Sequence, residues 1–361
     1  MTKTIKKGLP ILVAICLVFS GAFAFLSNHG NFSLIAFAEE NGNTSHGALS
    51  YSDGSSYDGD ILHGQIREGT GIFTWITGES YEGVWVNDEP EGMGVMTWPG
   101  LGTYKGEFAQ GKRNGEGTFT WTYDGEPEHG KPVSFEGNWQ NDLIGTYGKL
   151  VLSGIGEYEG DFSKQKRHGS GTFRWLNGDV YTGKWENDSI TGLGKLVLAD
   201  GNVLEGSFTK GVLSKGTATY SVSGGKAVRS VAGGKLKADV TVTYDNGTVV
   251  TGQLKGQEFT GKVTITYSTG DKYVGALKNG LKHGKGLYTW STGAHYDGDW
   301  VNDKMSGTGK YYYSKDETKS YLTGTFKNGV PDGKLVYVAE TKLKYNTTWS
   351  NGKCTNITYK K

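Results

Sequence analysis

The chain shows two patterns of hydrophobic and polar positions. Residues 9–26 form an uncharged apolar run behind a short segment that contains Lys3, Lys6 and Lys7. Between residues 53 and 359, apolar residues or glycines alternate with polar residues in short runs, which turn-forming residues separate. A period of two is typical of β-strands that bury one face. The pattern therefore predicts an apolar leader followed by a long all-β region.

One segment of the β region shows the alternation clearly. Aromatic residues, methionine and glycines take every second position in two runs, YEGVW from Tyr81 and GMGVMTW from Gly92. The residues VNDEPE between them favour a turn, so the segment predicts one β-hairpin. Glycine weakens a strand unless another group must come close to its backbone. We expect that group to be an aromatic ring from the facing or neighbouring strand.

The same segment recurs about a dozen times, in most steps after 23 residues. Clear copies begin at Tyr81, Tyr104, Tyr158, Tyr181, Tyr273 and Tyr296, and weaker ones at Tyr57, Phe135, Leu204, Val250, Tyr321 and Tyr345. One hairpin is marginally stable, but a row of hairpins buries a continuous stripe. The stripe is expected to contain Tyr81, Trp85, Trp98, Tyr104, Trp121, Tyr158, Trp175, Tyr181, Trp185, Tyr273, Trp290, Tyr296 and Trp300.

These patterns predict an all-β fold, an elongated single-layer ribbon of about twelve tandem β-hairpins, preceded by an N-terminal apolar signal or anchor helix. Its expected segments are a leader (1–38), a linker (39–52), an N-terminal half of the array (53–223), a degenerate repeat (224–244) and a C-terminal half (245–359). Aromatic residues are missing between Gly224 and Lys237, so we expect the array to bend or break there. Residues 123–133 are an insertion that predicts a protruding loop, and Thr347 replaces a glycine in a C-terminal repeat that predicts a cap.

The template Y-x-G-x-[W/F], followed by a turn and G-x-G-x-x-x-W, resembles the MORN (membrane occupation and recognition nexus) repeat. The resemblance covers most of the chain and implies an array of β-hairpins. In that family, enzymatic activity resides in attached domains, and the residues outside the repeats here leave no room for one. The family name reflects proposed binding to membrane lipids.

The leader indicates export. A basic start and an apolar run of eighteen residues fit either a signal peptide or an N-terminal membrane anchor. Small residues at alternate positions mark possible cleavage sites after Ala24 and after Ala38. Because the basic residues precede the apolar run, the rest of the chain is expected outside the cytoplasm, secreted or anchored to the outer face of the cytoplasmic membrane.

Charge and composition argue against several functions. The net charge is +1, which argues against nucleic acid as a partner. The 2 cysteines cannot form a zinc cluster or a disulfide framework. Alternate acids such as Glu157, Glu159 and Asp161 could bind Ca²⁺, but a solvated strand face is the simpler interpretation. We expect no catalytic residue, no metal and no cofactor.

Basic residues gather near some of the predicted turns. They are Lys112, Arg113, Lys166, Arg167, His168, Lys282, His283 and Lys285. Such turn tips could bind an anionic membrane or a cell-wall polymer, although other turns are acidic. The favoured interpretation is a non-enzymatic scaffold that binds another protein or itself, so that a homo-oligomer is plausible, through aromatic and polar surface and open sheet edges.

Overall fold

A computed structural model describes residues 33–35 and 44–360, apart from residue 257. These residues form β-strands and turns, and no helix occurs among them. The all-β prediction is therefore confirmed for the described residues. The apolar helix expected within residues 9–26 lies outside them. In the described part of the chain, no helix has the length and apolar character needed to cross a membrane.

The described residues divide into two compact units, an N-terminal unit of residues 33–35, 44–200 and 206–212 and a C-terminal unit of residues 201–205 and 213–360. The strands of the N-terminal unit are β1 (Ser33–Ile35), β2 (Ser45–Ser50), β3 (Ser56–Leu62), β4 (Ile66–Thr74), β5 (Ser80–Val86), β6 (Glu89–Trp98), β7 (Gly102–Ala109), β8 (Lys112–Trp121), β9 (Pro132–Gln140), β10 (Leu143–Leu152), β11 (Gly156–Ser163), β12 (Lys166–Trp175), β13 (Val180–Glu186) and β14 (Ser189–Val197). Strand β15 (Val203–Thr209) contributes to both units.

The C-terminal unit continues with strands of the same kind. They are β16 (Val212–Val222), β17 (Gly225–Ala232), β18 (Lys235–Tyr244), β19 (Val249–Lys255), β20 (Glu258–Thr266), β21 (Lys272–Lys278), β22 (Leu281–Thr289), β23 (His295–Val301), β24 (Lys304–Tyr312), β25 (Tyr321–Lys327), β26 (Val330–Val338), β27 (Lys344–Ser350) and β28 (Lys353–Tyr359).

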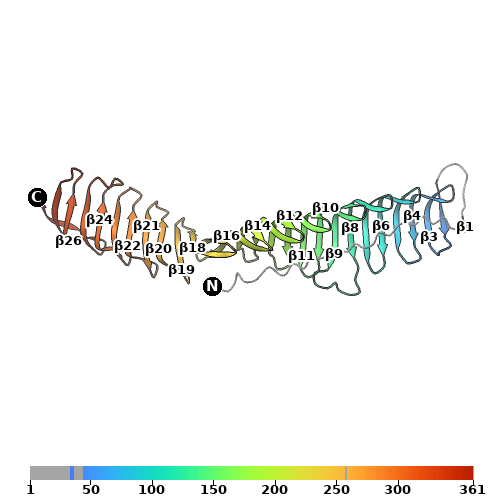
Figure 1. Ribbon diagram of the computed structural model, residues 1–361, viewed down its shortest axis with the longest axis horizontal. Helices are drawn as coiled ribbons and strands as arrows, with labels where there is room; N and C mark the ends of the chain where they lie inside the picture. The colour runs from blue at the N-terminus through green and yellow to red at the C-terminus, as the bar shows by residue number, and fades with distance from the viewer. Residues whose placement is uncertain (1–32, 36–43, 257, 361) are drawn as a thin grey trace. The chain divides into compact units, whose positions relative to one another are not determined.

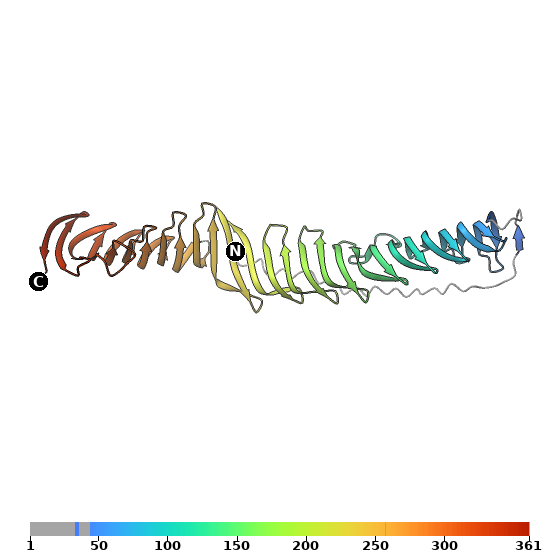
Figure 2. The ribbon, with the colours of Figure 1, turned by 90° about the horizontal axis from the view of Figure 1, so that it is seen from above.

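In each unit, consecutive strands pair antiparallel in chain order, from β2 to β14 and from β16 to β28. Strand β1 pairs with β2. Figure 1 shows the strands side by side within each unit, and Figure 2 shows a single layer from above. Each unit is thus a row of hairpins, as the repeats predict.

Two-residue turns close the hairpins. Between β5 and β6, Asn87 and Asp88 have φ angles of 48° and 68°. Positive φ at both positions is the geometry of a type I′ turn, whose twist matches that of paired strands and which asparagine and aspartate tolerate. The turn is therefore shorter than the predicted VNDEPE stretch, since Glu89 already belongs to β6.

A β-bulge follows each of these turns in the second strand of the hairpin. In the pairing of β5 with β6, Gly83 lies opposite Gly94 but Val84 lies opposite Glu91, so β6 has two extra residues. Gly92 stands within the bulge with a φ of 60°, a conformation that residues with a Cβ adopt only at a cost. The first glycine of the G-x-G pair is thus required by the backbone itself.

The second glycine of the pair makes room for a tyrosine. The side chain of Tyr81 is fully buried, and a Cβ built on Gly94 would lie 2.4 to 2.6 Å from three atoms of its ring. Real Cβ contacts are not that short, so the ring rests directly on the Gly94 backbone. Gly117, Gly171, Gly194, Gly286 and Gly309 lie under the corresponding tyrosines in the same way. The expected contact between rings and glycine backbone is confirmed.

Three departures from the template have structural counterparts. Residues 122–131 form the expected loop, and the Tyr123 hydroxyl donates a hydrogen bond to the Pro132 carbonyl at 2.7 Å. Between Gly224 and Lys237, where we expected a bend or a break, the sheet does not break. Strands β16 to β19 pair without interruption there, because Ala227, Val240 and Val242 take over the buried positions. At Thr347 the side chain is buried and its hydroxyl donates to the Leu335 carbonyl.

Candidate functional site

The tyrosine and tryptophan rings line one face of each unit, which we call the inner face. Ten members of the predicted stripe are at most 6% exposed, while Trp98, Trp121 and Trp290 are half-buried. Neighbouring rings meet edge to face: Tyr81 lies 5.1 Å from Trp85 at an interplanar angle of 90° and 4.9 Å from Phe108 at 81°. The stripe is therefore present. Its tyrosines form T-shaped contacts, which aromatic quadrupoles prefer, whereas Trp98 is tilted at 35° to Phe119.

Polar atoms of the rings bond to the backbone. The Tyr181 hydroxyl donates to the Lys184 carbonyl at 3.1 Å, and the Trp185 indole donates to the Gly171 carbonyl of the preceding hairpin at 3.2 Å. Burial of the phenol raises the pKa of Tyr181 to about 12. Because the indole bond crosses from one hairpin to the one before it, each hairpin fixes its neighbour.

Basic side chains on the inner face connect successive hairpins in a second way. The Arg67 backbone N–H and Nε both donate to the Asp88 carboxylate, at 2.9 and 3.0 Å, and its Nη2 donates to the Asp88 carbonyl. Its guanidinium lies 4.4 Å from the centre of a Trp85 ring, within the range of a cation–π contact. We call this combination, a cation bonded to the turn aspartate of the next hairpin and placed over its tryptophan, a latch.

The latch occurs four times in the described residues. Its ion pairs are Arg67–Asp88, Arg113–Asp142, Arg167–Asp188 and Lys282–Asp303. The cations lie over Trp85, Trp139, Trp185 and Trp300 respectively. In its own hairpin each cation stands opposite a smaller apolar residue, Ile61, Phe108, Phe162 or Leu277. A latch therefore joins a hairpin with isoleucine, leucine or phenylalanine opposite the cation to a hairpin that carries a tryptophan, so that the structural unit is a pair of repeats.

The latch at Arg167 is the most deeply buried. The side chains of Arg167 and Asp188 are 1% and 8% exposed, against 17% and 44% for Arg67 and Asp88. Burial lowers the pKa of Arg113 in the second latch, while Asp142 opposes that shift. A buried pair of this kind stabilises mainly as a pair, because the loss of one partner leaves the other charge uncompensated.

The latches correct the prediction of basic turn tips. Arg113 and Arg167 are buried beneath the turns and are not available to a ligand, because the two-residue turns end before them and they already belong to β8 and β12. Lys282 belongs to a latch, and Lys285 is bound to Asp299 at 2.8 Å. Lys112 and His168 are exposed, whereas Lys166 and His283 are half-buried. The eight residues thus form no common basic surface.

The opposite face of the sheet, the outer face, carries charged and hydroxyl side chains together with exposed apolar ones such as Ile72 and Leu287. Lys149 pairs with Glu157 at 2.8 Å across β10 and β11. The Asp299 carboxylate binds the Lys285 ammonium and accepts bonds from the N–H and hydroxyl of Thr308, which hold its pKa below the usual range. The alternate acids therefore face basic and hydroxyl groups. No cluster of three or more potential metal ligands occurs in the described ranges.

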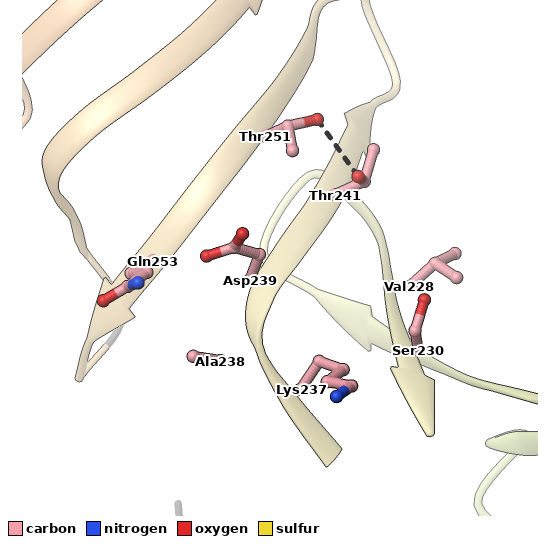
Figure 3. A pocket seen from close by; sticks show the side chains of 8 residues that line it. All are labelled: Val228, Ser230, Lys237, Ala238, Asp239, Thr241, Thr251 and Gln253. Atoms are coloured by element: carbon pink, nitrogen blue, oxygen red, sulfur yellow. Dashed lines mark hydrogen bonds between the residues drawn. The ribbon is translucent and has the colours of Figure 1, made fainter. Parts of the chain in front are cut away.

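A shallow hollow opens on the C-terminal unit (Figure 3). It lies over β17, β18 and β19, beside the bulge of β18. Its lining residues are Val228, Ser230, Lys237, Ala238, Asp239, Thr241, Thr251 and Gln253. The Thr241 and Thr251 hydroxyls lie 3.0 Å apart. The lining is mostly exposed, so the hollow does not enclose a ligand.

The last strand, β28, is exposed at every residue. It pairs with β27 along one edge, and no strand of the described residues pairs with the other edge. An unpaired edge presents backbone donors and acceptors that can add a further strand. Ile357 and Tyr359, each 57% exposed, add apolar surface beside it.

Comparison with known proteins identifies the repeats. The family model described as MORN repeat matches residues 81–103, 104–122, 158–180, 181–203, 273–295, 296–318 and 323–334. No curated protein matched the chain. Among solved structures, the TCP10 domain of Danio rerio CPAP in complex with a peptide of Danio rerio STIL is similar at 12% identity and a TM-score of 0.26, over 53% of this chain and 95% of that chain. A streptogramin B lyase structure matches at 12% identity and a TM-score of 0.11, over 89% and 88% of the two chains. TM-scores this low support no inference about fold or function.

Proposed function

Because this chain contains seven MORN repeats, we propose that it is a non-enzymatic, exported scaffold that mediates protein–protein contacts or self-association at the cell envelope. MORN repeats suggest a role in protein interaction or membrane binding. Latches and indole bonds between successive hairpins favour a stiff support over a mobile active site. The apolar run of residues 9–26 supports export.

The observation that carries the proposal is the open edge of β28. Two copies related by a twofold axis can pair this strand antiparallel about Asn356. That register places Thr355 opposite Ile357 and Lys353 opposite Tyr359, so no like charges meet and β-branched residues face each other. A symmetric contact of this type closes on itself as a dimer.

Light scattering tests the self-association. At tens of micromolar, residues 39–361 are expected to show dimers. The double variant Thr355→Lys/Ile357→Lys, which places lysines opposite each other in that register, is expected to be monomeric. Thr325→Lys is the matched control, because Thr325 is exposed on β25, a strand that lies away from the sheet edge, and this variant should remain dimeric. A wild-type chain that is only monomeric overturns self-association and leaves another protein as the partner.

The alternative is an envelope-associated binder of anionic lipid or cell-surface polymer. The exposed Lys112 and the half-buried Lys166 support it, since each basic residue near an anionic surface contributes about 1 kcal/mol. Co-sedimentation with anionic vesicles or cell-wall material across a salt series tests it. Pelleting that high salt abolishes and that Lys112→Ala/Lys166→Ala weakens would favour this function over the scaffold.

A further inference from the structure

The hairpin of β17 and β18 reverses the large and small side chains of the inner face. In the template hairpin, Tyr81 covers the paired Gly83 and Gly94. The equivalent pair in β17 and β18 is Arg229 and Val240, and Ala227 stands at the tyrosine position. Arg229 alternates with the buried Ala227 and Val231, so its side chain belongs to the inner face. The long cationic side chain of Arg229 thus occupies a position at which other hairpins have a glycine.

Arg229 differs from the latch cations in having no anion. Its Nε is buried and has no hydrogen-bond partner, and it forms no ion pair among the described residues. The residues across from it are Ala218 on β16 and Val240 on β18, both buried and apolar. In this hairpin Leu236 occupies the latch position opposite Val231, so no cation stands where a turn aspartate could bind it.

Arg229 as a whole is half-buried, and Nε is its one buried nitrogen without a hydrogen-bond partner. A buried N–H without an acceptor lowers stability, and a leucine or methionine would fill the same space without that cost. A guanidinium presents forked N–H donors that match a carboxylate in a bidentate geometry. The half-buried Tyr220 pairs with Ala227, so it lies on the same face as Arg229, two residue positions farther along β16 and β17. The patch therefore combines one cation with an aromatic and aliphatic rim.

We propose that Arg229 is a binding site for a carboxylate side chain of a partner protein, whose apolar neighbours lie on Tyr220. The inference gives a partner chemistry to the scaffold function proposed above and rests on it. A single guanidinium in an apolar rim favours a singly charged carboxylate, because a phosphate gathers several donors. The lysines of this hairpin, such as Lys226, alternate with the inner-face residues and lie on the outer side.

Nuclear magnetic resonance of the chain labelled with ¹⁵N-arginine tests the site. The probe is the blocked tripeptide acetyl-Val-Glu-Val-amide, and acetyl-Val-Gln-Val-amide is its uncharged match. Arg229→Met identifies the Nε–H signal of Arg229. That signal is expected to shift saturably with the glutamate peptide, and at least tenfold more of the glutamine peptide should be needed for the same shift. Arg174, exposed on β12, is the internal control and should not respond.

One further variant separates a binding role from a structural one. Arg229→Gln keeps hydrogen-bond donors but removes the charge, and it is expected to lose the glutamate peptide while its circular dichroism stays that of the wild type. Equal shifts with both peptides, no shift at millimolar peptide, or a larger response to inorganic phosphate would each overturn the proposal. The peptide assay does not depend on dimerisation, so a monomeric chain that binds the peptide refutes self-association and leaves the site intact.

Discussion

The contact between Tyr181 and the glycines beneath it predicts a selective rescue. A Cβ on Gly194 would lie 2.3 to 2.6 Å from three atoms of the Tyr181 ring, whereas a Cβ on Gly183 would also lie 2.5 Å from the Gly194 Cα. The ring can be removed by mutation, but the backbone of the facing strand cannot. Gly194→Ala is therefore expected to be rescued by Tyr181→Ala, and Gly183→Ala is not.

The magnitudes follow from the burial of this ring. Tyr181 is fully buried, so Tyr181→Ala should lower the free energy of unfolding by about 3 to 5 kcal/mol, as large aromatic truncations do. Gly194→Ala should cost about 1 to 3 kcal/mol through overpacking, because the ring is held by its hydroxyl bond to the Lys184 carbonyl. In the double variant the alanine methyl enters space that the ring has left. The pair should therefore be less destabilised than the sum of the single variants, by about 1 to 3 kcal/mol.

Hydrogen exchange of the amides in β13 and β14 is the suitable assay, because neighbouring hairpins of a repeat array can unfold separately. Urea unfolding followed by circular dichroism gives an independent value for the whole unit. The corresponding cycle with Gly183→Ala is the matched control and should show a clash that persists without the ring. Additive effects for Tyr181 and Gly194 would show that the ring does not determine the glycine, and the reasoning would fail.

The latches and titrating groups give three further predictions. Arg167→Met should lower the free energy of unfolding by about 3 to 5 kcal/mol, because it leaves Asp188 buried without its cation. Arg67→Met should lower it clearly less, since Asp88 is 44% exposed. Urea midpoints followed by tryptophan fluorescence compare the two variants, and equal losses would contradict the role of burial. Burial raises the pKa of Tyr181 to about 12 from about 10 in the unfolded chain, so its contribution is complete below pH 10 and is lost between pH 10 and 12. Absorbance at 295 nm should then rise together with the loss of circular dichroism, and ionisation near pH 10 in the folded chain would refute the burial argument. The Lys285 ammonium and Thr308 keep the pKa of Asp299 below the unfolded value of about 3.9, so its contribution is present above pH 4 and is lost as the pH falls through the lower pKa. Asp299→Asn should flatten the acid limb of stability against pH, and an unchanged limb would exclude this carboxylate as a cause.

Much of the fold could be predicted from the sequence because each hairpin is specified locally. Alternation fixes which face is buried, and Asn-Asp pairs such as Asn87-Asp88 fix the turn. The glycine beneath each tyrosine ring also has a local cause, since its position in the strand pairing determines which ring covers it. Periodicity and turn chemistry therefore sufficed for the hairpins and for the stripe.

The latches could not be predicted in the same way because they join residues of different repeats. Arg167 and Asp188 are 21 residues apart in the sequence, and both lie where a solvent-exposed turn was expected. A basic residue near a turn looks the same whether it points to solvent or lies over the next tryptophan. A usable signal nevertheless exists, since Arg67 and Lys282 also precede their aspartates by 21 residues. Comparing pairs of repeats would have revealed it, whereas aligning single repeats concealed it.

The pairing of repeats also explains why interaction sites are expected where the latches stop. Within the described residues, β17 to β20 carry Leu236 and Phe259 at the latch positions, and the last hairpin carries Cys354 there. In latched hairpins, each inner-face cation and each turn aspartate already has a partner, so little binding capacity is left. Arg229 and the open edge of β28 both lie in hairpins without a latch, where a charge or a row of backbone groups has no internal partner. The same coupling that stiffens the array thus determines where it can bind another molecule.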